Sequence, residues 1–243
     1  MDARNGSRGS DPTESADTPP GFSTVILLSA GSGIKELSTF LTKARPDIDI
    51  HPVKSRDALD RVTEYANLSR TRLIAFGTDV VVSEELLSRL GFGAYNFHPG
   101  PPDYPGWAPA SFAVYDGARS FGATAHVMTA KVDAGPIVGV RLFPVPPRMT
   151  ANQLALGALV AALELFRELG PLLVNASDPL PVVPLSWSRR KHTRAEFRQM
   201  CDLPPDITED ELKRRTAAFD IDEPWAPGLF RSLTGDRTPP NRS

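Results

Sequence analysis

Short, continuous apolar runs alternate with helical segments along the first half of the chain. The run Val25–Leu28 contains no polar residue, which is typical of a strand buried on both faces of a sheet. It ends in a turn at Ala30–Gly33, and a helical pattern follows over Ile34–Ala44. The same order continues with a strand over Ile48–Ile50, a helix over Arg56–Leu68, a strand over Arg72–Phe76, a helix that begins after the N-cap Ser83 and stops at Gly91, and a strand over Phe92–Phe97. This alternation predicts an α/β fold with a Rossmann-like, mostly parallel sheet and helices on both faces.

The second half departs from a strictly parallel pattern. A short helix is expected over Pro109–Tyr115, and strands over Phe121–Met128 and Ile137–Phe143. These two strands are expected to be antiparallel because the connection between them is too short for a crossover. A capping box at Thr150–Gln153 predicts the start of a helix that ends at Gly170–Pro171. The expected apolar stripe of this helix consists of Leu156, Leu159, Leu163 and Phe166.

Composition divides the chain into four segments. Residues 1–22 and 235–243 are poor in apolar residues and are predicted to be disordered tails. Residues 23–185 are predicted to form the main domain, and residues 186–234 a short helical or irregular C-terminal extension that includes a charged helix over Glu209–Phe219.

Charge and cysteine content exclude several function classes. The net charge of −2 and a pI near 6.1 provide no protein-wide attraction for nucleic acid or anionic lipid. Cys201 is the only cysteine, so neither a disulfide within the chain nor a Cys-based zinc cluster is expected. There is no apolar run of membrane-spanning length and no secretory signal pattern, so a cytoplasmic protein without a membrane partner is predicted.

Polar residues suited to catalysis occur at the end of the fourth predicted strand. Asn96 and His98 are two positions apart, so their side chains leave the same face of a strand. A proline-rich loop follows as far as Gly106, and Asp133 lies in the turn Val132–Gly135, where Gly135 is expected to provide a positive φ. An amide, an imidazole and a carboxylate can stabilise an oxyanion and move protons around it. The alternative is that Asn96, His98 and Asp133 only shape turns.

Two further groups have a structural and a functional interpretation. His126 either lines the site or is a hydrogen-bonded core histidine, and with His98 and Asp133 it would provide the ligand types of an open metal site. Their spacing matches no short metal motif. Gly31, Ser32 and Gly33 lack the third glycine of a dinucleotide fingerprint but can present amide hydrogens to an anionic substrate group at a helix N-terminus.

From about Thr24 to Leu173 the chain resembles the catalytic domain shared by the phosphoribosylglycinamide, methionyl-tRNA and sugar N-formyltransferases. The resemblance rests on Asn96–Pro99, the proline loop closed by Gly106, the strand Phe121–His126, and Asp133–Ile137, in that order. It implies 10-formyltetrahydrofolate as formyl donor, no metal, and a catalytic set of Asn96, His98 and Asp133. By analogy it places the folate pocket at Gly77, Thr78, Asp79, Val80 and Val81 and at Thr129 to Asp133, including Val132.

Departures from the family pattern bear on the acceptor. The proline loop is one residue shorter than usual, and only fifteen residues follow Gly228, too few for the C-terminal barrel of the tRNA enzymes. With the acidic pI, this favours a small-molecule amine over tRNA. The loop Ala30–Gly33 does not match the phosphate loop of the glycinamide ribotide enzymes, which weakens that acceptor too.

Three other functions remain open from sequence alone. A hydrolase would release formate from the same folate by using water in place of the amine. A metal-dependent amidohydrolase would use His98, His126 and Asp133. A non-catalytic ligand-binding domain would keep only the fold. The sequence does not indicate the pathway or the oligomeric state.

Overall fold

A six-stranded sheet forms the centre of the molecule, with strand order β2-β1-β3-β4-β5-β6. The computed structural model describes residues 21–219. The strands are β1 (Thr24–Leu28), β2 (Asp49–Val53), β3 (Thr71–Phe76), β4 (Ala94–His98), β5 (Ser120–Val127) and β6 (Ile137–Pro144). Strands β1 to β4 are parallel, whereas β5 runs antiparallel to both β4 and β6. The predicted mostly parallel α/β sheet is confirmed, including its antiparallel end.

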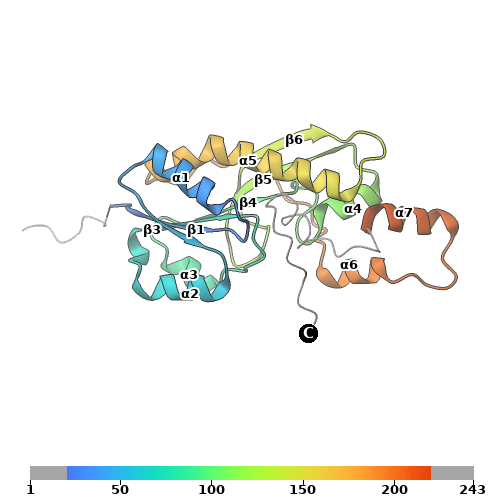
Figure 1. The fold of residues 1–243 in the computed structure, drawn as a ribbon, viewed down its shortest axis with the longest axis horizontal. Coiled ribbons are helices and arrows are strands. Elements are labelled where there is room, and N and C mark those ends of the chain that lie inside the picture. The colour runs from blue at the N-terminus through green and yellow to red at the C-terminus, as the bar shows by residue number, and fades with distance from the viewer. Residues whose placement is uncertain (1–20, 220–243) are drawn as a thin grey trace, which may run out of the picture.

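Helices cover both faces of this sheet (Figure 1). The helices of residues 21–219 are α1 (Ile34–Ala44), α2 (Arg56–Tyr65), α3 (Glu84–Arg89), α4 (Pro109–Asp116), α5 (Ala151–Asn175), α6 (Arg194–Cys201) and α7 (Glu209–Phe219), with a 3-10 turn at Leu68–Arg70. α1 and α5 pack on one face against a core that includes Leu27, Phe97 and Phe166. α2 and α3 pack on the other face against Ile26 and Leu73. Alternate residues of β1 therefore face opposite cores, as a strand buried on both faces requires.

The sheet changes from parallel to antiparallel at β4, and this is where the candidate catalytic residues lie. β4 pairs with β3 in parallel and with β5 antiparallel, with Asn96 opposite His126 and His98 opposite Thr124. The carboxyl end of β4 thus meets the middle of β5. A topological switch of this kind is a preferred ligand site in open α/β sheets.

Two helices differ from their predicted bounds. The helix predicted over Arg56–Leu68 ends at Tyr65, and a 3-10 turn follows. α5 does not stop at Gly170–Pro171 but continues to Asn175. Its last turn is retained because Leu173 and Val174 are fully buried, and this packing outweighs the proline's missing donor.

The buried face of α5 overlaps the predicted stripe only in part. Leu156 is 39% exposed, whereas Leu154, Ala158 and Ala162 are buried. Small residues occupy this face because α4 and the sheet approach it closely. The predicted stripe is therefore correct at Leu159, Leu163 and Phe166, which pack on the core, and wrong at Leu156.

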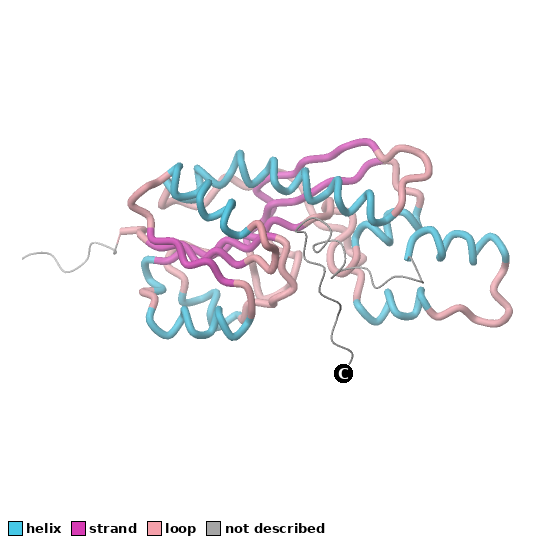
Figure 2. The backbone as a smooth tube through the Cα atoms, viewed as in Figure 1, coloured by secondary structure: helices cyan, strands magenta, loops and turns pink. Residues whose placement is uncertain are grey.

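The C-terminal extension packs beside the main domain. α7 lies along α4 (Figures 1 and 2). Phe219 contacts Phe112 and Phe197 in a small separate core. Phe22, which the sequence assigns to the N-terminal tail, is buried against Phe92. The rest of the predicted tails, residues 1–20 and 235–243, and the end of the extension, residues 220–234, lie outside the described residues. Within residues 21–219, none of the helices is both long and apolar enough to cross a membrane.

Candidate active site

Four side chains predicted from the sequence meet at the carboxyl end of β4. Asn96 and His98 leave the same face of β4, and His126 projects from the adjacent strand β5. Asp133 reaches them from the loop between β5 and β6. Its carboxylate lies between the two histidines, with Oδ2 3.6 Å from His98 Nδ1 and Oδ1 3.4 Å from His126 Nε2. The structure thus brings together residues that are up to 37 positions apart in the sequence.

The loop that carries Asp133 has an unusual backbone. Asp133 itself has a positive φ of 46°, a conformation in which Asp is tolerated better than most residues. Gly135 was expected to provide the positive φ, and that expectation is wrong. Gly135 is needed for space instead, because a Cβ there would lie 1.9 Å from the Val127 carbonyl oxygen. The close approach of Gly135 to β5 holds the carboxylate against the histidines.

The environment of Asp133 favours its ionised form. Burial alone would raise the pKa of the Asp133 carboxyl, but the charge of His98, the contacts with His126 and the Gly106 N–H oppose it. The net effect is a pKa below the ordinary aspartate range. Gly106 N donates to Oδ2 at 2.9 Å. Asp133 is therefore a buried carboxylate that stays charged at neutral pH.

His126 fixes the orientation of Asn96. Its Nδ1 faces the Val127 carbonyl at 2.9 Å, and a carbonyl can only accept, so Nδ1 carries a hydrogen. Nε2 lies 3.2 Å from Asn96 Nδ2 and 3.4 Å from Asp133 Oδ1, so it accepts from Asn96 in the neutral ring and donates to Asp133 when the ring is protonated. Asn96 has a second amide hydrogen that this contact does not use. His126, which the sequence left open between site and core, is both buried and part of the site.

The proline loop provides backbone groups to the same site. His98 Nε2 lies 3.2 Å from the Tyr104 carbonyl oxygen, so an acceptor faces each ring nitrogen of His98. Thr124 donates to the Gly100 carbonyl at 2.8 Å and ties the loop to β5. A Cβ on Gly100 would lie 2.5 Å from His98 Nε2, so the loop passes the imidazole at the closest distance that a glycine allows. The loop is therefore a wall of the site as well as a turn.

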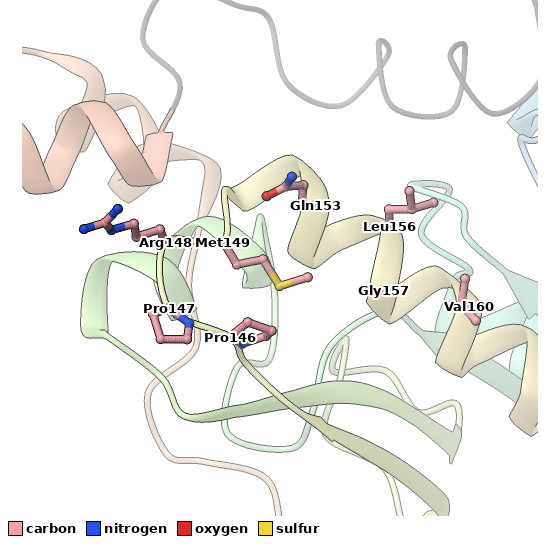
Figure 3. A pocket seen from close by; sticks show the side chains of 8 residues that line it. All are labelled: Pro146, Pro147, Arg148, Met149, Gln153, Leu156, Gly157 and Val160. Carbon is pink, nitrogen blue, oxygen red and sulfur yellow. The ribbon is translucent and has the colours of Figure 1, made fainter.

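A pocket of about 840 Å³ opens beside these groups. Asp133 lines it together with Lys131 of the same loop, and the C-terminal extension contributes Trp187, Arg189 and Lys191. Its size is within the range of pockets that bind small molecules. A second hollow of about 610 Å³ lies between the start of α5 and the loop after β6 (Figure 3). Its lining is mainly apolar, and Arg148 brings the only formal charge among its lining residues.

The residues assigned to folate by analogy lie on two loops. Gly77 to Val81 follow β3, the neighbour of β4, and Thr129 to Val132 follow β5. The extension spans both loops, because Arg194 pairs with Asp79 at 3.4 Å and Lys191 Nζ donates to the Val132 carbonyl at 2.8 Å. Gly31, Ser32 and Gly33 follow β1 and are two strands away from β4. The structure does not bring these three into the catalytic cluster.

The metal hypothesis gains no support from the geometry. Among residues 21–219, no group of three or more His, Cys, Asp or Glu residues is arranged to hold a metal ion. The Asp133 carboxylate instead contacts both His98 and His126. Asn96 contacts the His126 ring, and the Tyr104 carbonyl contacts the His98 ring.

Sequence reasoning missed three parts of the site: the Tyr104 carbonyl, the Gly106 N–H and the Trp187 indole. The first two are backbone groups, which residue type does not reveal. Gly106 has a φ of 96°, and its place at the end of the proline loop was the available signal. Trp187 is a large aromatic residue in a polar, basic segment, and this contrast was the available signal for the indole.

Comparisons with known proteins agree with this fold. A family model described as formyl transferase matches residues 54–164, which include β3 to β6 and the four residues Asn96, His98, His126 and Asp133. Methionyl-tRNA formyltransferases from Roseiflexus castenholzii and Roseiflexus sp. are each 27% identical over 217 residues, or 85% of this chain. The chain spans 65% and 62% of the lengths of these two relatives. The predicted resemblance to the formyltransferase family is confirmed.

Solved structures share the fold. A sugar N-formyltransferase from Shewanella aligns with a TM-score of 0.63 at 17% identity, covering 81% of this chain and 87% of its own. A 4-N formyltransferase from Francisella tularensis aligns with a TM-score of 0.64 at 16% identity and the same coverage. An N-formyltransferase from Helicobacter canadensis, in complex with folinic acid and dTDP-3-aminofucose, aligns with a TM-score of 0.61 at 16% identity over 82% of this chain and 80% of its own.

Proposed function

We propose that this protein transfers a formyl group from 10-formyltetrahydrofolate to the amine of a small-molecule acceptor, with Asn96, His98 and Asp133 as catalytic residues. The observation that carries the proposal is the buried Asp133 carboxylate between His98 and His126, with Asn96 oriented beside it. A structural cluster would not need a charged carboxylate held by three partners at the edge of a pocket.

The donor fits the residues present. A reduced folate carries carboxylates on its glutamate, and the pocket beside Asp133 has Lys131, Arg189 and Lys191 in its lining. The loops proposed to hold it are Gly77–Val81 and Thr129–Val132. When bound, the donor supplies the formyl group and a leaving nitrogen.

The chain's own groups then act on the developing charge. The second amide hydrogen of Asn96 stabilises the oxyanion that forms when the amine attacks the formyl carbon, and His98 Nε2 joins it by exchanging the Tyr104 carbonyl for the oxyanion. Asp133 stays ionised, holds His98 in orientation and stabilises its positive charge. The amine loses a proton through a water that Asp133 binds, and the leaving nitrogen takes a proton up. The products are a formylated amine and tetrahydrofolate.

A small-molecule acceptor is favoured by the net charge of −2 and by the fold shared with sugar N-formyltransferases. Because the two Roseiflexus relatives are methionyl-tRNA formyltransferases, tRNA is the alternative acceptor that the experiment must test.

Calorimetric titration with 5-formyltetrahydrofolate, a stable stand-in for the donor, tests the proposal. Binding at micromolar Kd, about −8 kcal/mol, is expected. Screening of amines for formylation follows, with nucleotide-linked amino sugars and charged initiator tRNA as separate arms. No binding at millimolar ligand would overturn the donor assignment, and formylation of the tRNA alone would overturn the small-molecule acceptor.

A further inference from the structure

Trp187 reaches the catalytic residues from the C-terminal extension. Its indole ring lies edge-on to His126, with ring centroids 5.1 Å apart and an interplanar angle of 89°. It also lies edge-on to His98, at 5.8 Å and 70°. Its Nε1–H donates to the Gly135 carbonyl at 2.8 Å. One side chain therefore touches both histidines and is tied to the loop that carries Asp133.

The indole stands at the boundary between the histidines and the pocket. Trp187 and Asp133 line this pocket, whereas His98 and His126 do not and are only 6% and 2% exposed. Removal of the indole would open the space between the two imidazoles and the 840 Å³ pocket. Truncation of an exposed side chain that does not line the pocket, for example Val182, which is 61% exposed and lies just before the extension, would not.

Water is the natural competitor in formyl transfer. If water attacks the formyl carbon, a C–O bond forms, the bond from that carbon to the folate nitrogen breaks, the nitrogen takes up a proton, and formate leaves with tetrahydrofolate. The oxyanion is the same type as in transfer, so Asn96 and His98 would stabilise both. The outcome then depends on which nucleophile reaches the carbon, and exclusion of water is what a closed site provides.

The geometry points to Trp187 as the residue that keeps water from the formyl carbon and so favours transfer over hydrolysis. This assigns a role to the extension: it completes the wall of the site that the main domain leaves open. The inference rests on the proposed function, because it concerns how the same site selects its nucleophile.

The test needs no knowledge of the acceptor. Protein is incubated with 10-formyltetrahydrofolate alone, and formate release is measured for the wild type and for Trp187→Ala, Trp187→Phe and Val182→Ala. Trp187→Ala is expected to release formate about tenfold faster than the wild type, because water gains access. Trp187→Phe keeps a ring against the histidines and is expected to stay within about threefold of the wild type. Val182→Ala is the matched control and is expected to be unchanged.

Binding of 5-formyltetrahydrofolate and thermal unfolding are measured on each variant, so a change in rate is separated from loss of folding. If Trp187→Ala does not fold, Trp187→Leu takes its place. Formate release that is unchanged or slower in a variant that still binds the folate would overturn the role of Trp187, because a merely structural residue can only lower the rate. Absence of folate binding, or rapid formate release by the wild type, would overturn the proposed transferase function instead.

Discussion

At the scale of single residues, Asp133 is the group whose chemistry is most constrained. Replacement by Asn keeps its size but removes the charge that faces His98 and His126. We expect Asp133→Asn to lower kcat for formyl transfer by about 100-fold or more, since positioned acid–base groups contribute factors of that order. Binding of 5-formyltetrahydrofolate, measured by calorimetry, should change far less. Equal kcat values would contradict a catalytic role for Asp133.

The stability difference between wild type and Asp133→Asn is expected to depend on pH. The folded-state pKa of Asp133 lies below the unfolded value of about 3.9. Its ionised form therefore stabilises the fold fully above that pH, and the contribution is lost as the pH falls towards the folded value. Urea unfolding should show the largest advantage of wild type over Asp133→Asn above about pH 5, with a decline towards pH 3. An advantage independent of pH would contradict this account.

Gly100 offers a second test at this scale. Its replacement by Ala places a Cβ 2.5 Å from His98 Nε2 and 2.9 Å from the Pro109 side chain, so the imidazole must move. We expect kcat to fall at least about tenfold, because misplacement of a catalytic group by about 1 Å has effects of this size or larger. Gly21→Ala is the control, since nothing lies within 4 Å of the Cβ built there. Wild-type kcat in Gly100→Ala would show that the loop is not a rigid wall.

At the scale of elements, Arg72 joins β3 to the end of α5. It is 1% exposed and donates to the carbonyls of Phe92, Leu173, Ala176 and Ser177. Replacement by Met leaves these acceptors without their donor, and we expect a loss of about 3 kcal/mol in the free energy of unfolding. Arg70→Met, which removes one exposed contact with the Gly21 carbonyl, should cost less than about 0.5 kcal/mol. Chemical denaturation measures the free energy of unfolding of both variants and of wild type.

Elements also show what could be predicted from this sequence. Val25–Leu28 and Arg72–Phe76 could be placed because apolar runs depend on local composition, and the antiparallel end of the sheet followed from a short connection. The last turn of α5 could not, because burial of Leu173 outweighs Pro171 only in the folded chain. The position of Trp187 against His98 likewise depends on contacts between residues far apart in sequence.

At the scale of the whole molecule, the extension is attached to the main domain at His192. Its backbone pairs with the proline loop, through His192 N to the Pro105 carbonyl and Trp107 N to the His192 carbonyl, at 3.0 and 2.9 Å. Its ring stacks on Phe112 with centroids 3.7 Å apart, and within the described residues its buried Nδ1 has no hydrogen-bond partner. A charged imidazole is poorly accommodated between apolar rings. Protonation of His192 should therefore weaken the attachment.

The sign of this effect follows from the surroundings of the ring. Burial, with a smaller effect of Arg190, lowers the pKa of His192, while Glu196 and Asp116 oppose this. The unfolded chain then binds a proton more readily than the folded one, so stability is complete above the unfolded value of about 6.5 and falls as the pH drops through the folded value. His192→Phe keeps the stack and cannot be protonated. We expect the free energy of unfolding to fall less between pH 8 and pH 5 in His192→Phe than in wild type. The segment that carries His192 also carries Trp187, so its detachment at low pH should raise formate release from 10-formyltetrahydrofolate in wild type but not in His192→Phe. Identical pH profiles of formate release in the two proteins would show that the extension is held by other contacts.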